Sequence, residues 1–162
     1  MSDAVFEGGC FCGAIRFKMN RRPMFIHACH CRDCQRQTGG PFAINGLIEG
    51  DAIEIARGAP VEHRLPTTSG RAHVLSACAD CGAQLLSDYG GRGWLKFVRI
   101  VALDEADHFE PDVHIYTRSK LPWLPLPAGA RKFEAYYEMS EEWPEESLAR
   151  RADAEARHKS RQ

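Results

Sequence analysis

Seven cysteines carry most of the potential chemistry in this 162-residue sequence, and they are grouped rather than scattered. They form two close pairs and one triplet: Cys10 and Cys12, Cys78 and Cys81, and Cys29, Cys31 and Cys34. Closely spaced thiolates are typical zinc ligands, because one backbone turn can deliver two of them to a tetrahedral ion. A glycine follows each pair (CFCG and CADCG) and allows a tight turn around a metal without a Cβ clash.

The number of thiols suggests a division into four and three. The two pairs can close one structural zinc site and tie the N-terminal segment to the middle of the chain. The triplet then surrounds a second metal and leaves one coordination position exchangeable, which is typical of catalytic zinc. Two alternatives remain open: a cysteine from a pair completes the triplet, or His27 or His30 does.

Two other uses of the cysteines are less favoured. Disulfides are rare in a reducing cytosol, and an odd number of cysteines cannot all pair. Redox-active pairs need a depressed thiol pKa, usually at a helix N-terminus, whereas each group here lies near a further cysteine. The pattern therefore favours metal binding.

Short β-like stretches separated by Gly and Pro surround the cysteines and predict a mainly β single domain over residues 1–139. The predicted strands cover residues 14–19, 52–58, 61–65, 71–78, 94–103, 112–116 and 131–137. A short helix is predicted at 31–39, ending at Gly39 and Gly40. Helix formers with alternating charge fill 140–162, which predicts an exposed C-terminal helix and tail.

The overall composition excludes several classes of function. The formal net charge of −1 gives no electrostatic footprint for nucleic acid, and no apolar run is long enough to span a bilayer. The N-terminus lacks the basic and apolar regions of a secretory signal. We therefore expect a cytoplasmic protein that binds neither nucleic acid nor membranes.

Five segments, in the same order, resemble the glutathione-dependent formaldehyde-activating enzyme family, which includes centromere protein V. They are GGCFCGAIRF (8–17), CHCRDCQRQTGGPF (29–42), CADCGAQL (78–85), ALDEADHFEPDVHIY (102–116) and SKLPW (119–123). The resemblance covers roughly residues 5–137. It implies a β-tent-like zinc fold with two zinc ions per chain, a structural one on the two cysteine pairs and a second one on the triplet. It also implies that glutathione and formaldehyde combine to S-hydroxymethylglutathione, a carbon–sulfur lyase reaction run in reverse.

A mechanism follows from the charge of the triplet site. Zinc with three thiolates is formally −1 and a poor Lewis acid, but it would keep an incoming thiol deprotonated and nucleophilic. Arg32 and Arg36 are candidates to offset the negative charge, His114 to protonate the product alkoxide, and Trp123 to line the cleft. The alternatives are a thiol-binding carrier with little catalysis and a non-catalytic, zinc-stabilised interaction module.

Overall fold

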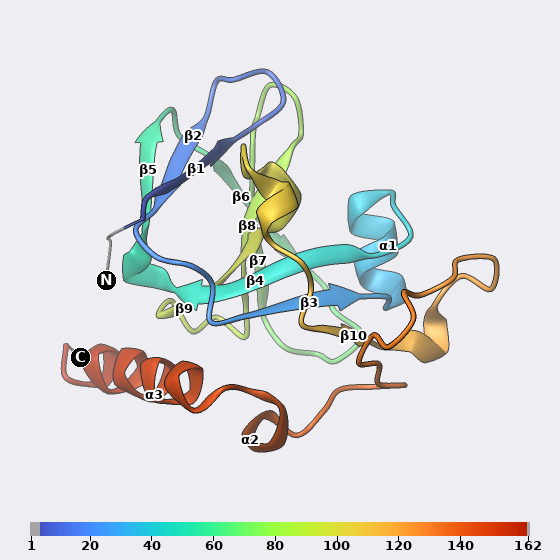
Figure 1. Ribbon diagram of the computed structural model, residues 1–162. Helices are drawn as coiled ribbons and strands as arrows, with labels where there is room; N and C mark the ends of the chain where they lie inside the picture. The colour runs from blue at the N-terminus through green and yellow to red at the C-terminus, as the bar shows by residue number, and fades with distance from the viewer. Residues whose placement is uncertain (1–3, 162) are drawn as a thin grey trace.

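Two β-sheets build most of the protein, and the structure, a computed structural model, describes residues 4–161 (Figure 1). In this range the strands are β1 Phe6–Gly9, β2 Arg16–Met19, β3 Phe25–Cys29, β4 Ala43–Glu49, β5 Ile53–Arg57, β6 Val61–Leu65, β7 His73–Ala77, β8 Gln84–Tyr89, β9 Leu95–Arg99 and β10 Val113–Ile115. The helices are α1 Arg32–Thr38, α2 Met139–Glu142 and α3 Glu145–Lys159. Short 3-10 turns occupy Gly50–Ala52, Ile100–Ala102, Ala106–His108 and Thr117–Ser119.

The smaller sheet has the strand order β1-β2-β5, and the larger has the order β10-β3-β4-β9-β8-β7-β6. Every pairing is antiparallel except that of β10 with β3. One apolar cluster, which includes Phe17, Ile48 and Val98, joins β2 to the large sheet. A second cluster, which includes Phe25 and Leu47, joins that sheet to Trp143 near the C-terminus. The mainly β prediction, with its short helix at the triplet and its C-terminal helix, is confirmed.

The register of the large sheet decides which side chains can meet. Cys29 lies opposite Ala43, and Asn45 pairs with His27 on one side and with Arg99 on the other. Since successive side chains of a strand point to opposite faces, Cys29, His27, Asn45 and Arg99 share one face, which we call the triplet face.

Residues 131–137 do not form the predicted strand. The segment makes an isolated bridge between Lys132 and His114. Backbone bonds then connect Phe133 to His114 and Thr117, so the segment follows the edge of β10 and the turn after it instead of pairing with one straight strand.

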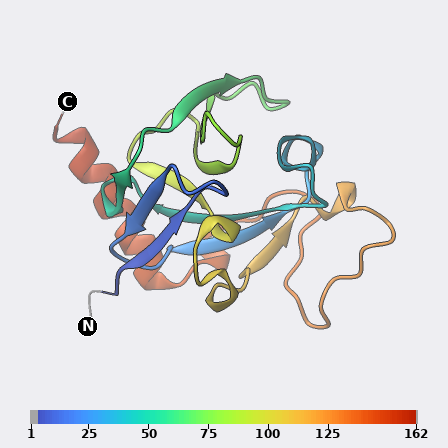
Figure 2. The same ribbon diagram turned by 90° about the horizontal axis from the view of Figure 1, so that it is seen from above.

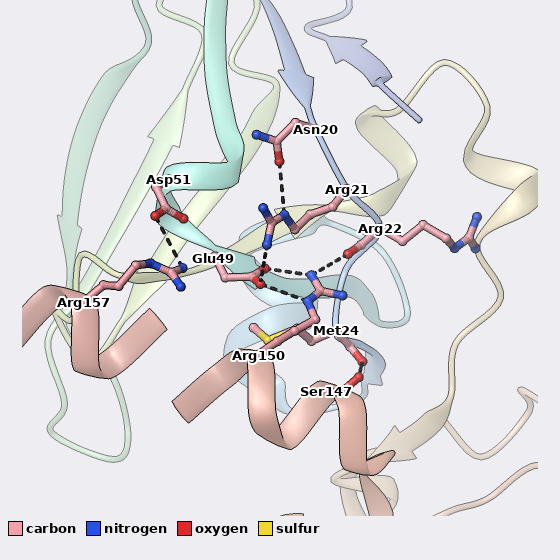
Figure 3. Close-up of polar contacts among 9 residues, drawn as sticks. All are labelled: Asn20, Arg21, Arg22, Met24, Glu49, Asp51, Ser147, Arg150 and Arg157. Carbon is pink, nitrogen blue, oxygen red and sulfur yellow. Dashed lines mark hydrogen bonds and ion pairs between the residues drawn. The ribbon is translucent and has the colours of Figure 1, made fainter. Parts of the chain in front are cut away.

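The C-terminal helix α3 lies along the large sheet, beneath β3 and β9 in Figure 1. Its existence matches the prediction, and most of it is exposed, but Ser147 and Ala154 are buried, so one side of the helix packs on the sheet, which the prediction did not include. Ser147 Oγ donates a hydrogen bond to the Met24 carbonyl at 2.7 Å, as Figure 3 shows. The proposed division of the chain at residues 139 and 140 stays a prediction.

A buried carboxylate anchors this helix (Figure 3). Arg150 donates to both Glu49 oxygens from Nε and Nη2 at 2.9 and 2.8 Å, and Arg21 Nη1 donates at 3.3 Å. The Glu49 side chain is 1% exposed. Two guanidinium groups thus neutralise a carboxylate at the end of β4.

Among residues 4–161, no helix has the length and hydrophobicity that crossing a membrane requires.

Candidate functional site

The two cysteine pairs form one cluster with four thiols. The Sγ atoms of Cys10, Cys12, Cys78 and Cys81 all lie within 4.8 Å of one another. The Sγ atoms of Cys10 and Cys12 are 3.6 Å apart, and those of Cys12 and Cys78 are 3.7 Å apart. The glycine that follows each pair has a positive φ, 78° at Gly13 and 73° at Gly82, as the predicted tight turns require.

The triplet forms a separate cluster where β3 ends and α1 begins. The Sγ atoms of Cys29, Cys31 and Cys34 lie within 4.8 Å of one another. Cys31 is the N-cap of α1, and its sulfur accepts the backbone N–H of Cys34 at 3.3 Å, the position that a Ser or Asp oxygen usually fills. The helix ends at Gly39 with φ 70°, as predicted. This local geometry holds two of the three thiols on one helical turn.

No other His, Cys, Asp or Glu in the described part of the chain joins either cluster. The two histidines considered for the triplet point to other partners. His27 Nε2 lies 2.5 Å from the Tyr137 hydroxyl, and His30 Nε2 lies 2.9 Å from His114 Nδ1. The side chains therefore gather as the predicted four and three.

The three triplet thiols perturb one another strongly. Hydrogen bonds from Cys29 and Cys34 lower the pKa of Cys31 to about 2. The hydrogen bond to Cys31, together with burial, raises the pKa of Cys29. Three thiols this close share their protons, and a bound cation is the simplest way to stabilise them as thiolates.

A buried arginine that the sequence analysis missed lies on the triplet face. The Arg99 side chain on β9 is 4% exposed, and its Nη1 donates to Asn45 Oδ1. Its Nη2 donates to Gln84 Oε1 at 3.1 Å and to Gln37 Oε1, at the end of α1, at 3.4 Å. Burial lowers the pKa of Arg99, while the negative charge of Cys34, Cys29 and Cys31 counteracts this.

The buried position of Arg99 could have been inferred from the alternation of side chains along its strand. Phe97 and Arg99 lie two positions apart on one strand, and the register places Phe97 opposite Leu47 on the same face. An arginine at an inward position of a strand is unusual unless it has a buried partner.

In the part of the chain that the structure describes, the four other predicted site residues, the two charge-offsetting arginines and the two cleft residues, make no hydrogen bond with the triplet thiols. Arg32 and Arg36 lie on the exposed side of α1, where Arg32 Nη1 donates to Gln35 Oε1 at 2.5 Å. The Trp123 side chain is 70% exposed, in the loop that follows Lys120. His114 pairs in register with Ala28, so its ring faces His30 across the sheet from Cys29.

Comparison with known proteins points in one direction. A family model described as glutathione-dependent formaldehyde-activating enzyme matches residues 5–119. Two relatives carry provisional names with that same description. A Halomonas elongata protein is 30% identical over 160 residues, covering 90% of this chain and 92% of that protein. A Penicillium rubens protein is 31% identical over 116 residues, covering 65% of this chain but only 59% of that protein.

A solved structure supports the fold independently. The crystal structure of a Rhodobacter sphaeroides protein superimposes with a TM-score of 0.50 at 18% identity, covering 65% of this chain and 96% of that one. At this identity the likeness concerns the fold alone.

Proposed function

Because this chain belongs to the family of glutathione-dependent formaldehyde-activating enzymes, we propose that it joins a thiol, glutathione or a similar one, to a small aldehyde such as formaldehyde. The reaction forms a carbon–sulfur bond, and its reverse is a lyase reaction. The observation that carries the proposal is the open triplet: three thiols gather with no fourth protein ligand among the described residues, while a closed cluster of four lies elsewhere in the chain.

The residues of both clusters fit zinc. Tetrahedral zinc–thiolate bonds of about 2.3 Å place two sulfurs about 3.8 Å apart. The Sγ separations of 3.6 and 3.7 Å in the four-thiol cluster match this spacing. The proposal therefore assigns two zinc ions per chain, one structural on Cys10, Cys12, Cys78 and Cys81, and a second on Cys29, Cys31 and Cys34. The seven unpaired cysteines are typical of a reducing compartment and support a cytoplasmic location.

Zinc on the triplet would lower the pKa of a thiol in its fourth position and so supply a nucleophile at neutral pH. The protein's own groups prepare that position. The N–H of Cys34 orients the Cys31 sulfur, and the sheet shields Cys29 from water. Arg99 provides positive charge on the triplet face, a role that the sequence analysis assigned to Arg32 and Arg36.

The test is the absorption spectrum of the cobalt-substituted protein during titration with glutathione, with the metal content measured at each step. We expect a saturable change in the sulfur-to-cobalt bands, which Cys31→Ala abolishes while the cobalt of the four-thiol cluster remains. A spectrum of the fully loaded protein that ignores glutathione would refute thiol binding.

The rate of formaldehyde exchange then distinguishes an enzyme from a thiol-binding carrier. Thiols add to formaldehyde without help, so an enzyme must accelerate the exchange of formaldehyde with S-hydroxymethylglutathione above the spontaneous rate. A protein that binds glutathione but leaves this rate unchanged would be a carrier.

A further inference from the structure

Two side chains on the triplet face of the large sheet hold buried nitrogen atoms without a hydrogen-bond partner. They are Nε of Arg99 and both ring nitrogens, Nδ1 and Nε2, of His73. The Arg99 side chain is 4% exposed and that of His73 is 6% exposed. An unsatisfied buried donor costs free energy, and such atoms in a native protein call for an explanation such as an absent ligand.

Arg99 lies beside α1, the helix that carries Cys34 and has Cys31 as its N-cap. It shares the triplet face with Asn45, its neighbour in register. The Gln37 side chain, three residues after Cys34 on α1, accepts from its Nη2. No ion pair in the described chain gives this guanidinium a carboxylate partner. Arg99 is thus a buried cation directed toward the site by neutral amides.

The unused capacity of Arg99 indicates what it can bind. Both terminal nitrogens already donate to amide oxygens, so Nε is the nitrogen left without an acceptor. A carboxylate usually takes two parallel N–H groups of a guanidinium. Both N–H groups of Nη2 are in use, so Nε–H has no free neighbouring N–H with which to form that pair, and it suits one oxygen atom that carries or develops negative charge.

His73 can add a second donor from β7. Its ring packs edge-on against Tyr89, with the centroids 5.3 Å apart. Burial, followed by the charge of Arg99, lowers the pKa of His73, and the charges of Asp33, Asp88 and, least, Cys31 act in the opposite direction. The ring is therefore neutral. His73 pairs in register with Tyr89, and Ser87, two residues earlier on β8, pairs with Phe97, so the His73 side chain lies on the triplet face with Arg99. A neutral imidazole has one N–H to donate.

We propose that Arg99 Nε and His73 bind the carbonyl oxygen of the aldehyde and stabilise the alkoxide that forms when the thiolate adds. This proposal rests on the function proposed above. The sulfur lone pair forms the C–S bond, and the π electrons of C=O move to the oxygen, which accepts hydrogen bonds from the two side chains. The proton released when the thiol ionised returns to this oxygen through solvent, so nothing is oxidised or reduced.

The first test measures exchange kinetics of Arg99→Gln, Arg99→Lys and His73→Gln. Removing one donor to an oxyanion costs roughly 100-fold in kcat. We expect a loss of this size in Arg99→Gln, with the KM for glutathione changed less than threefold and the cobalt–glutathione titration unchanged. Arg99→Lys keeps the positive charge but loses the Nε donor, so its exchange rate should lie between those of Arg99→Gln and the wild type. It also serves as the test variant if Arg99→Gln fails to fold. The matched controls are Arg64→Gln and His63→Asn on β6, where both side chains are exposed.

A second measurement reads the contact directly. In ¹⁵N-arginine-labelled protein, the Nε–H resonance that is missing in Arg99→Lys belongs to Arg99. We expect it to shift when formaldehyde is added to the glutathione-loaded protein, and not when glutathione is added alone.

The outcomes separate the two proposals. If the wild type binds glutathione and accelerates exchange but the Arg99 and His73 variants keep their rates, the oxygen site is wrong and the function stands. If Arg99→Gln loses the cobalt–glutathione titration, Arg99 supports the thiol site and the oxygen site is again wrong. If the wild type neither takes up glutathione nor accelerates exchange, the proposed function fails, and the oxygen site fails with it.

Discussion

The two cysteine clusters use the same ligand atom in opposite ways. The four-thiol cluster joins parts of the chain far apart in sequence, since Cys12 and Cys78 are 66 residues apart. Cys10 and Cys78 belong to the apolar cluster that joins the two sheets. The triplet is local, spanning one strand end and one helical turn, and Cys29 belongs to the apolar cluster on the other face. The four-thiol cluster therefore links distant segments of the chain, whereas the triplet is formed within a single local segment.

The surroundings of the clusters differ as much as their connectivity. Among the described residues, the triplet shares its face of the large sheet with Arg99 and His73, two buried side chains with unmet hydrogen-bonding capacity, whereas no such atom belongs to the four-thiol cluster. The four-thiol cluster lies on the loops between β1 and β2 and between β7 and β8, whereas the triplet lies where β3 ends and α1 begins; the ribbon in Figure 2 shows the course of these segments. On the proposed function, ligand number and neighbours, rather than ligand type, separate the structural site from the reactive one.

The largest expected effect is on stability when each cluster loses one thiol. Structural zinc contributes about 10–16 kcal/mol of apparent binding free energy, comparable to the whole stability of a domain. We expect Cys78→Ala to be largely unfolded at 25 °C. Cys31→Ala should keep the fold, bind about one zinc ion instead of two, and melt within about 8 °C of the wild type.

Circular dichroism and metal analysis of the two variants check this prediction, with an Ala substitution at the exposed Ser69 as the control. Equal melting temperatures for Cys78→Ala and Cys31→Ala would remove the distinction between the clusters.

Local features of both clusters could be predicted from the sequence, while long-range ones could not. The turns at Gly13 and Gly82 and the helix from Arg32 to Thr38 depend on neighbouring residues, so their spacing was sufficient. The position of His114 depends on the parallel pairing of β10 with β3, which also brings it to His30, 84 residues away, and a shift of one residue reverses the face.

The same reason explains why Arg99 and the packing of α3 were missed. Arg99 acquires its partners from β4, β8 and α1, none of which is its neighbour in sequence. In α3 the charged sequence suggested a solvated helix, but Arg150 reaches Glu49 across 101 residues. A charge pattern shows that a residue needs a partner, but not where that partner lies.

A medium effect is expected from the contact that holds α3 against the sheet. Glu49→Gln breaks a buried ion pair and should lower the free energy of unfolding by about 3 kcal/mol. The control, Asp51→Asn, removes an exposed pair with Arg157 and should cost less than about 1 kcal/mol. Urea denaturation measures both.

Because Trp143 and Cys29 share one apolar cluster, Glu49→Gln should also speed the loss of zinc from the triplet to a chelator and leave the four-thiol site unaffected. Equal acceleration at both sites would contradict this.

The same ion pair predicts a pH dependence. Burial, the largest single effect, would raise the pKa of Glu49, but the hydrogen bond from Arg150, a backbone hydrogen bond and the charges of Arg150 and Arg21 together outweigh it, so the net pKa is lowered. A carboxyl with a lowered folded-state pKa stabilises the fold fully above its unfolded pKa of about 4.3 and loses that contribution as the pH falls below it. Acid denaturation of Glu49→Gln should therefore be less steep than that of the wild type between about pH 5 and pH 3. Identical slopes would show that another group controls this range.

The smallest effect on the reaction is expected from His114→Asn, which tests whether the sheet separates this residue from the chemistry. His114 and His30 bond to each other on the face opposite Cys29, so the exchange rate should stay within about twofold of the wild type. The substitution should still cost about 1–2 kcal/mol of stability, because it leaves His30 Nε2 buried without its partner. Exchange kinetics at pH 7 and urea denaturation measure the two effects, and Arg99→Gln provides the contrasting variant. A rate loss above tenfold with unchanged thiol binding would mean that His114 reaches the alkoxide after all, and the face assigned by the register would then have to be given up.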